Sequence, residues 1–111
     1  MLTQSCKKSG HSFQIVAWGP GEFRGGANPA TTWNLENPMR RDTVTVPAQS
    51  HVVIRFVADN PGVWALHCHV GWHMEGGMFV TLLERPDDLR GLVAEMDEGT
   101  RNRTMGFCEA R

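Results

Sequence analysis

The sequence predicts an all-β protein with a short helix near its C-terminal end, and two observations lead to that prediction. Short runs of apolar and β-branched residues recur at intervals of roughly ten residues between turn signals, as in a β-sandwich or barrel. After residue 85 the apolar residues instead take the spacing of one helix face. The chain has 111 residues, which is enough for one domain and too few for two.

Five segments have the composition of strands. The first spans residues 12–19, reads SFQIVAWG and stops at a Gly-Pro pair. A loop rich in Gly, Asn, Pro and Thr is expected over residues 20–38, and residues 71–77 have room for one turn of helix. A two-sheet sandwich usually has about seven strands or more, so some strands are expected to be missing. The remaining predicted strands are residues 42–46, 51–58, 63–68 and 78–83.

The C-terminal helix is predicted from its start signal and its apolar face. Pro86, followed by two aspartates, is typical of a first helical turn. Gly99 is expected to end the helix, and the apolar face is expected to pack on the sandwich. That face consists of Leu89, Leu92, Val93 and Met96, at positions i, i+3, i+4 and i+7.

Composition excludes several classes of partner. Hydrophobic residues make up 41% and charged residues 21%, as in a globular protein rather than a disordered one. The formal net charge of −1 argues against a general nucleic-acid binder and against a polybasic membrane binder. No apolar run approaches the roughly 20 residues of a membrane span. The first twenty residues also lack the apolar core of a secretory signal.

Histidine and cysteine cluster in one short segment. Three of the five histidines, His67, His69 and His73, fall within seven residues, and Cys68 lies between the first two. The other cysteines are Cys6 and Cys108, so the odd total leaves at least one thiol outside any intrachain disulfide. This cluster is the main indication of function in the sequence.

Cys68, His73 and Met78 form a Cys-x4-His-x4-Met pattern. A thiolate, an imidazole and a weak thioether are the ligands of a blue-copper electron-transfer site, because sulfur favours Cu(I) and imidazole accepts both oxidation states. A strand end, a loop and the start of the next strand would bring the three together. Such a site also requires a second histidine from elsewhere.

His67 and His69 flank Cys68 and would point to the opposite face of a strand. There they could bind a second metal centre, joined to the first by the Cys-His peptide links. A zinc site built from His67, Cys68, His69 and His73 is the alternative, although neighbouring strand residues do not readily converge on one tetrahedral ion. His51 opens a strand and is expected at the surface, and the tryptophans are expected mostly in the core: Trp18, Trp33, Trp64 and Trp72.

These motifs resemble the C-terminal copper signature of the multicopper oxidases, the group of laccases, ascorbate oxidases and fungal ferroxidases. The resemblance covers residues 10–86 and rests on His67-Cys68-His69 with His73 and Met78, supported by flanking segments at residues 10–13, 37–43 and 55–62 and by Trp72. It implies a partial cupredoxin-like Greek-key β-sandwich. It also implies that Cys68 and His73 bind type-1 copper with Met78 axial, while His67 and His69 each bind a type-3 copper.

The chain departs from the family at a second motif, His-Pro-x-His-x-His-Gly-His. Its last two positions match Gly10-His11, so its three ligand histidines fall at Gln4, Lys7 and Ser9. We therefore expect residues 1–9 to be an unrelated N-terminal segment joined to a truncated plastocyanin-like (cupredoxin) domain at 10–86, with residues 87–111 as C-terminal helix and tail. By the resemblance, His11 has a structural role and Cys108 matches a late cysteine that bridges to another domain.

The resemblance implies an oxidoreductase domain with copper as cofactor. Electrons from a small reducing substrate would pass through type-1 copper to a trinuclear cluster that reduces O2 to water, in a secreted enzyme whose other cupredoxin domains complete the cluster. The isolated chain is expected to be inactive. Two alternatives stay open: a truncated, non-catalytic cupredoxin-like module that binds copper weakly or not at all, and a split subunit completed by a partner chain.

Overall fold

The computed structural model describes residues 4–26 and 28–109, without the side chains of Gln4 and of residues 107–109. The described residues form eight strands and three helices, and the predicted all-β class with a C-terminal helical part is confirmed. The strands are β1 (Gln4–Lys8), β2 (Phe13–Pro20), β3 (Thr32–Trp33), β4 (Arg40–Arg41), β5 (Thr43–Val46), β6 (Ser50–Arg55), β7 (Gly62–Cys68) and β8 (Phe79–Glu84). The helices are α1 (Gly71–Glu75), α2 (Pro86–Glu95) and α3 (Glu98–Glu109).

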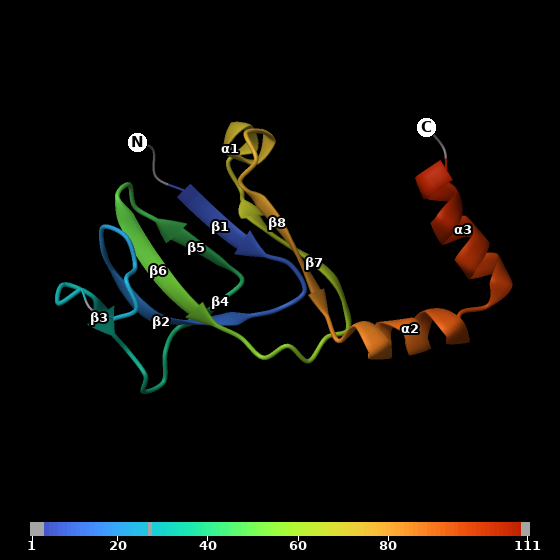
Figure 1. Ribbon diagram of the computed structural model, residues 1–111, viewed down its shortest axis with the longest axis horizontal. Coiled ribbons are helices and arrows are strands. Elements are labelled where there is room, and N and C mark those ends of the chain that lie inside the picture. The colour runs from blue at the N-terminus through green and yellow to red at the C-terminus, as the bar shows by residue number, and fades with distance from the viewer. Residues whose placement is uncertain (1–3, 27, 110–111) are drawn as a thin grey trace.

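Two antiparallel sheets form the body of the molecule (Figure 1). One has the strand order β5-β1-β7-β8, and in the other β2 pairs with β3, β4 and β6. The strand pair β2–β6 includes a bulge between Ile15 and Ala17. Because Cys68 ends β7 and Phe79 begins β8, the segment between these strands lies at one end of the first sheet.

The core between the sheets is small. Among the described residues, the buried apolar ones are Phe13, Val16, Ala17 and Cys68. The expected core role fails for three tryptophans, since Trp18, Trp33 and Trp72 are 43%, 47% and 68% exposed. Trp18 lines an open apolar cavity of about 720 Å³, so its ring is only partly covered.

Several local predictions differ from the structure. No strand is predicted over residues 4–8, and the structure has strand β1 there, between β5 and β7. The expected loop at residues 20–38 contains the short strand β3. His51 was expected at the surface and is 8% exposed. It is buried because its ring bonds on both sides, to the carbonyl oxygen of Gly21 at 3.0 Å and to the hydroxyl of Thr31 at 3.2 Å.

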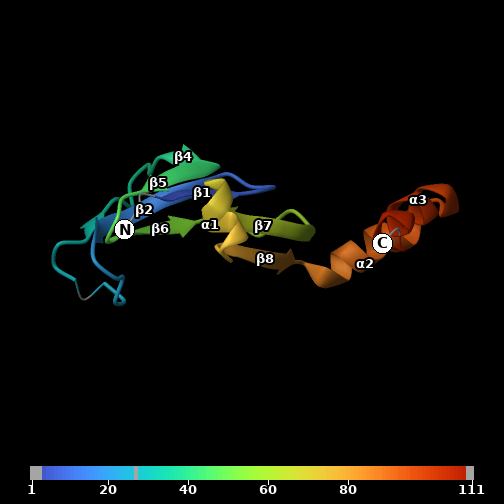
Figure 2. The same cartoon turned by 90° about the horizontal axis from the view of Figure 1, so that it is seen from above.

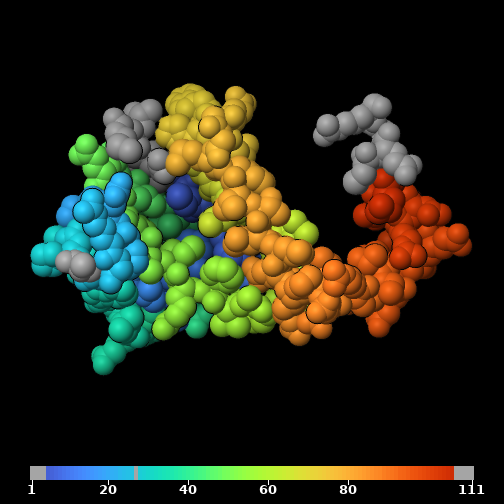
Figure 3. Space-filling view, in the orientation of Figure 1, coloured from blue at the N-terminus to red at the C-terminus, as the bar shows by residue number. Residues whose placement is uncertain are grey.

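The C-terminal helices project from the sandwich (Figures 2 and 3). Helix α2 starts at Pro86 as predicted, but it ends at Glu95 and has no buried residue, so the expected packing on the sandwich is wrong. Gly99 does not end a helix either, because it lies in the first turn of α3. Asp97 begins that helix by accepting a hydrogen bond from the backbone N–H of Thr100 at 2.9 Å. No helix in the described residues is long and apolar enough to cross a membrane.

Candidate metal centre

The segment between β7 and β8 is closed by backbone hydrogen bonds. The N–H of Cys68 donates to the carbonyl oxygen of Met78 at 2.9 Å, and the N–H of Met78 donates to that of His73 at 3.0 Å. Helix α1 lies within this loop and turns the chain back on itself. The three residues of the Cys-x4-His-x4-Met pattern are therefore brought together by local structure.

Cys68 and His73 are in side-chain contact. The Cys68 Sγ lies 3.5 Å from the His73 Nδ1, and Cys68 is only 2% exposed. Met78 and Cys68 both line a cavity of about 450 Å³ between the sheets. Trp72 presents its ring at an angle of 69° to the His73 ring, with the centroids 6.4 Å apart, and lies on the solvent side.

His67 and His69 lie beside each other, one residue to either side of Cys68 along the strand. Their rings stack with centroids 5.7 Å apart and planes 29° apart. His67 also stacks on Phe79 of β8, its partner in the register, at 5.7 Å. Alternation along β7 places the His67 ring on the opposite face of the sheet from the Cys68 side chain, and the His69 ring stacks beside it.

The donor set fits copper in kind. A buried thiol in contact with an imidazole, with a thioether on the same cavity, matches the soft donors that favour Cu(I). Within the described residues, no three His, Cys, Asp or Glu side chains gather closely enough to hold a metal ion. The zinc site considered from the sequence, which needs four such side chains, is therefore not assembled.

The positions of the missing family histidines lie on or beside β1. Lys7 is the register partner of His67 and shares its outward face. A lysine therefore stands where the second motif would place a histidine. The N–H of Ser9 donates to the carbonyl oxygen of Ala65 at 2.8 Å. The side chain of Gln4 lies outside the described residues, as does that of Cys108.

Cys6, which the sequence left without a role, lies directly across from Cys68 on β1. Both cysteines are free thiols and line the same cavity. Burial raises the pKa of the Cys6 thiol, and the neighbouring Cys68 raises it further. A second sulfur thus lies next to the candidate ligands.

A buried ion network at the other end of β1 was not predicted. The Lys8 Nζ donates to the Glu84 Oε1 at 2.9 Å and lies 2.8 Å from the His11 Nδ1. The His11 Nε2 is 3.0 Å from the Glu84 Oε2, although the two atoms are not in hydrogen-bonding orientation. His11 therefore has structural partners, and none of them is one of the candidate copper ligands.

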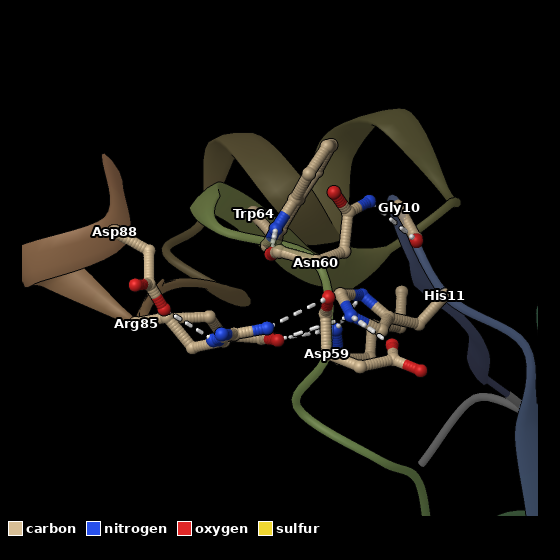
Figure 4. Close-up of polar contacts among 9 residues, drawn as sticks. Gly10, His11, Asp59, Asn60, Trp64, Arg85 and Asp88 are labelled. Atoms are coloured by element: carbon tan, nitrogen blue, oxygen red, sulfur yellow. Dashed lines mark hydrogen bonds and ion pairs between the residues drawn. The ribbon is translucent and has the colours of Figure 1, made fainter. Parts of the chain in front are cut away.

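The surroundings of His11 are polar and well connected (Figure 4). Its Nε2 lies 3.8 Å from Asp59. The Trp64 Nε1 donates to the carbonyl oxygen of Asn60 at 2.8 Å, and the Asn60 amide donates to that of Gly10 at 3.2 Å. The network ties the start of β2 to the turn before β7, far along the sheet from Cys68.

Comparison with known proteins points to one family. The family model described as multicopper oxidase matches residues 7–88. Laccase-2 of Podospora anserina is 41% identical over an alignment of 102 positions, which covers 84% of this chain and 16% of that protein. The iron transport multicopper oxidase fio1 of Schizosaccharomyces pombe is 45% identical over 78 residues, covering 70% of this chain and 12% of its own.

Solved structures agree with the sequence relatives. Fet3p, a multicopper oxidase that functions in iron import, superposes with a TM-score of 0.79 and 32% identity, over 99% of this chain and 22% of that one. The laccase from Botrytis aclada superposes with a TM-score of 0.73 and 33% identity, over 91% and 17%. The chain thus spans less than a quarter of the length of each of these four proteins.

Proposed function

This chain belongs to the multicopper oxidase family, and from that premise we propose that it supplies the electron-entry copper site of such an enzyme. Copper is the cofactor that membership implies. The contact between the Cys68 Sγ and the His73 Nδ1 at 3.5 Å, in a loop closed onto Met78, is the observation that carries the proposal. These three residues would hold a type-1 copper, which when bound supplies one-electron chemistry between Cu(II) and Cu(I).

The role of this chain's residues follows from their order along β7. Cys68 would take part in accepting an electron from a reducing substrate, and its peptide links lead directly to His67 and His69. The stacking of His67 on Phe79 and on His69 holds both imidazoles on the outward face. In the whole protein, electrons would leave by these two residues toward a trinuclear cluster where O2 is reduced to water.

The outward face also fits contact with another domain. Val63, Phe79 and Leu83 lie on the same face of β7 and β8 as His67 and are 60%, 50% and 59% exposed. An apolar surface of this kind is typical of a protein interface. We propose that another cupredoxin domain of a longer, secreted protein covers it and provides the remaining cluster ligands.

The chain alone is proposed to lack oxidase activity. Three copper ions need more imidazoles than His67 and His69 offer, and the family's other positions hold Gln4, Lys7 and Ser9. A competing function is a cupredoxin-like module that holds no copper. It is favoured because, in the described part of the chain, no three His, Cys, Asp or Glu side chains gather closely enough to hold a metal ion.

Copper binding and turnover are tested separately. After reconstitution with Cu(II) and gel filtration, we expect bound copper that is lost in Cys68→Ser, and no O2 consumption above that of free copper with a phenolic or ferrous donor. Retained copper in Cys68→Ser, or no copper in the unmodified chain, would refute the proposed site. Turnover that disappears in His67→Ala would refute the proposed inactivity and favour a split subunit.

A further inference from the structure

Cys6 and Cys68 face each other across two paired strands. They are partners in the antiparallel register of β1 and β7. The N–H of His69 donates to the carbonyl oxygen of Ser5 at 2.5 Å, and the N–H of Ser9 donates to that of Ala65 at 2.8 Å. This pattern makes Cys6 and Cys68 a non-hydrogen-bonded pair, in which the Cα atoms are about 4.5 Å apart and the side chains lie close together on one face.

The two thiols differ in access. Cys68 is 2% exposed, whereas Cys6 is of intermediate exposure. Both line the 450 Å³ cavity between the sheets, together with apolar side chains such as Val44 and Leu66. A reagent in solution therefore reaches Cys6 before Cys68.

We propose that Cys6 and Cys68 are a redox pair that closes to a cross-strand disulfide. The Cα separation of a non-hydrogen-bonded pair lies within the range of about 4.4–6.8 Å that a disulfide spans, so the backbone need not move. The side chains of the neighbouring register pair, Lys7 and His67, point to the opposite face and therefore cannot come between the two thiols.

The oxidant we name is a small disulfide such as glutathione disulfide. The Cys6 thiolate attacks it, so the glutathione S–S bond breaks, a mixed disulfide forms on Cys6, and one glutathione thiolate leaves. The Cys68 thiolate then attacks the Cys6 sulfur, and the second glutathione leaves. In sum, the two protein thiols are oxidised to one protein disulfide. Glutathione disulfide takes up their two electrons and two protons and becomes two glutathione thiols.

Closure has a consequence at the candidate metal centre, and this part of the inference rests on the proposed function. The sulfur that bonds to Cys6 is the one that lies 3.5 Å from the His73 Nδ1. A disulfide sulfur is not a thiolate ligand, because the thiolate is the metal-binding form. Oxidation would therefore switch off copper binding, and reduction would restore it.

The experiment uses the Cys108→Ser chain, in which Cys6 and Cys68 are the only cysteines. The chain is reduced, exposed to glutathione disulfide and then alkylated. We expect an unalkylated chain whose mass is two hydrogen atoms below that of the reduced chain, and a cross-linked peptide pair that contains both residues. Arrest at a glutathione adduct on Cys6, or alkylation of both thiols, would overturn the proposal. As a matched control, Cys6→Ser combined with Lys7→Cys moves the thiol by one residue to the outward face and should not cross-link.

A second measurement separates this inference from the proposed function. Cu(I) affinity is measured by competition with a chromophoric chelator, for the reduced and the oxidised Cys108→Ser chain. We expect binding by the reduced form and at least a tenfold loss in the oxidised form. Equal affinity in the two forms would overturn the switch. A disulfide that forms in a chain whose reduced form binds no Cu(I) would instead refute the proposed copper site.

Discussion

Replacing Lys8 by methionine should sharply destabilise the fold. The Lys8 and Glu84 side chains are 0% and 5% exposed, and the Nζ–Oε1 distance is 2.9 Å. The ammonium also lies 4.1 Å from the Phe56 ring centroid, so methionine loses a cation–π contact as well. Breaking one side of a buried pair leaves an uncompensated charge, which costs about 3–5 kcal/mol. That loss is a large part of the roughly 5–15 kcal/mol by which domains are stable.

The assay is urea unfolding followed by tryptophan fluorescence, with a matched neighbour as control. Lys7 lies next to Lys8 on β1, is 36% exposed, and approaches Asp42 only to 4.0 Å. Lys7→Met should therefore change the unfolding free energy by no more than about 1 kcal/mol. If Lys8→Met does not fold, Lys8→Met combined with Glu84→Gln should recover most of the loss, because neither charge remains.

Equal effects of Lys8→Met and Lys7→Met would refute this reasoning, because the pair would then behave as an exposed one. The same holds if the double variant is less stable than Lys8→Met alone. In that case the carboxylate of Glu84 would stabilise the fold without Lys8, through His11, whose Nε2 lies 3.0 Å from the Glu84 Oε2.

Two further predictions concern a turn and a helix end. Gly10 has a φ of +77°, and a Cβ there would lie 2.4 Å from the Trp64 ring, so Gly10→Ala should lower the unfolding free energy in urea by about 2–5 kcal/mol. Gly21 has a similar φ of +70° but open space around it, so Gly21→Ala should lower it by only about 1–2 kcal/mol. Equal losses in the two variants would contradict the steric argument. Hydrogen bonds from the Thr100 side chain and backbone lower the pKa of Asp97, so its contribution to α3 is present above the ordinary value of 3.8 and is lost as the pH falls through the lowered pKa. Far-UV circular dichroism should show this acid loss of helix in the unmodified chain and a smaller one in Asp97→Ala, and identical acid transitions would contradict it.

Sequence reasoning worked where the interacting residues are close along the chain. Cys68, His73 and Met78 fall within one strand-loop-strand unit, so their spacing alone predicted that they meet, and the structure brings Cys68 and His73 into contact. The start of α2 was equally local, since Pro86 fixes the first helical turn. Copper ligation by these residues stays a prediction.

Features that depend on distant residues escaped prediction. Lys8 and Glu84 are 76 positions apart, and nothing in the sequence around either residue indicates an ion pair in the interior. The burial of His51 likewise depends on carbonyl and hydroxyl partners at Gly21 and Thr31, in a loop that has no regular pattern. The strand at residues 4–8 was missed because its polar residues lack strand propensity, and pairing on both sides by β5 and β7 overrides that preference.

X-ray absorption at the copper edge tests the central claim, that Cys68 and His73 hold copper. The sample is the Cu(I)-loaded chain carrying Cys6→Ser and Cys108→Ser, in which Cys68 is the only cysteine. The account predicts sulfur and imidazole scattering in the copper shell, with loss of the imidazole part in His73→Ala and of thiolate sulfur in Cys68→Ser. A shell made only of nitrogen and oxygen, or one unchanged in both variants, would contradict it.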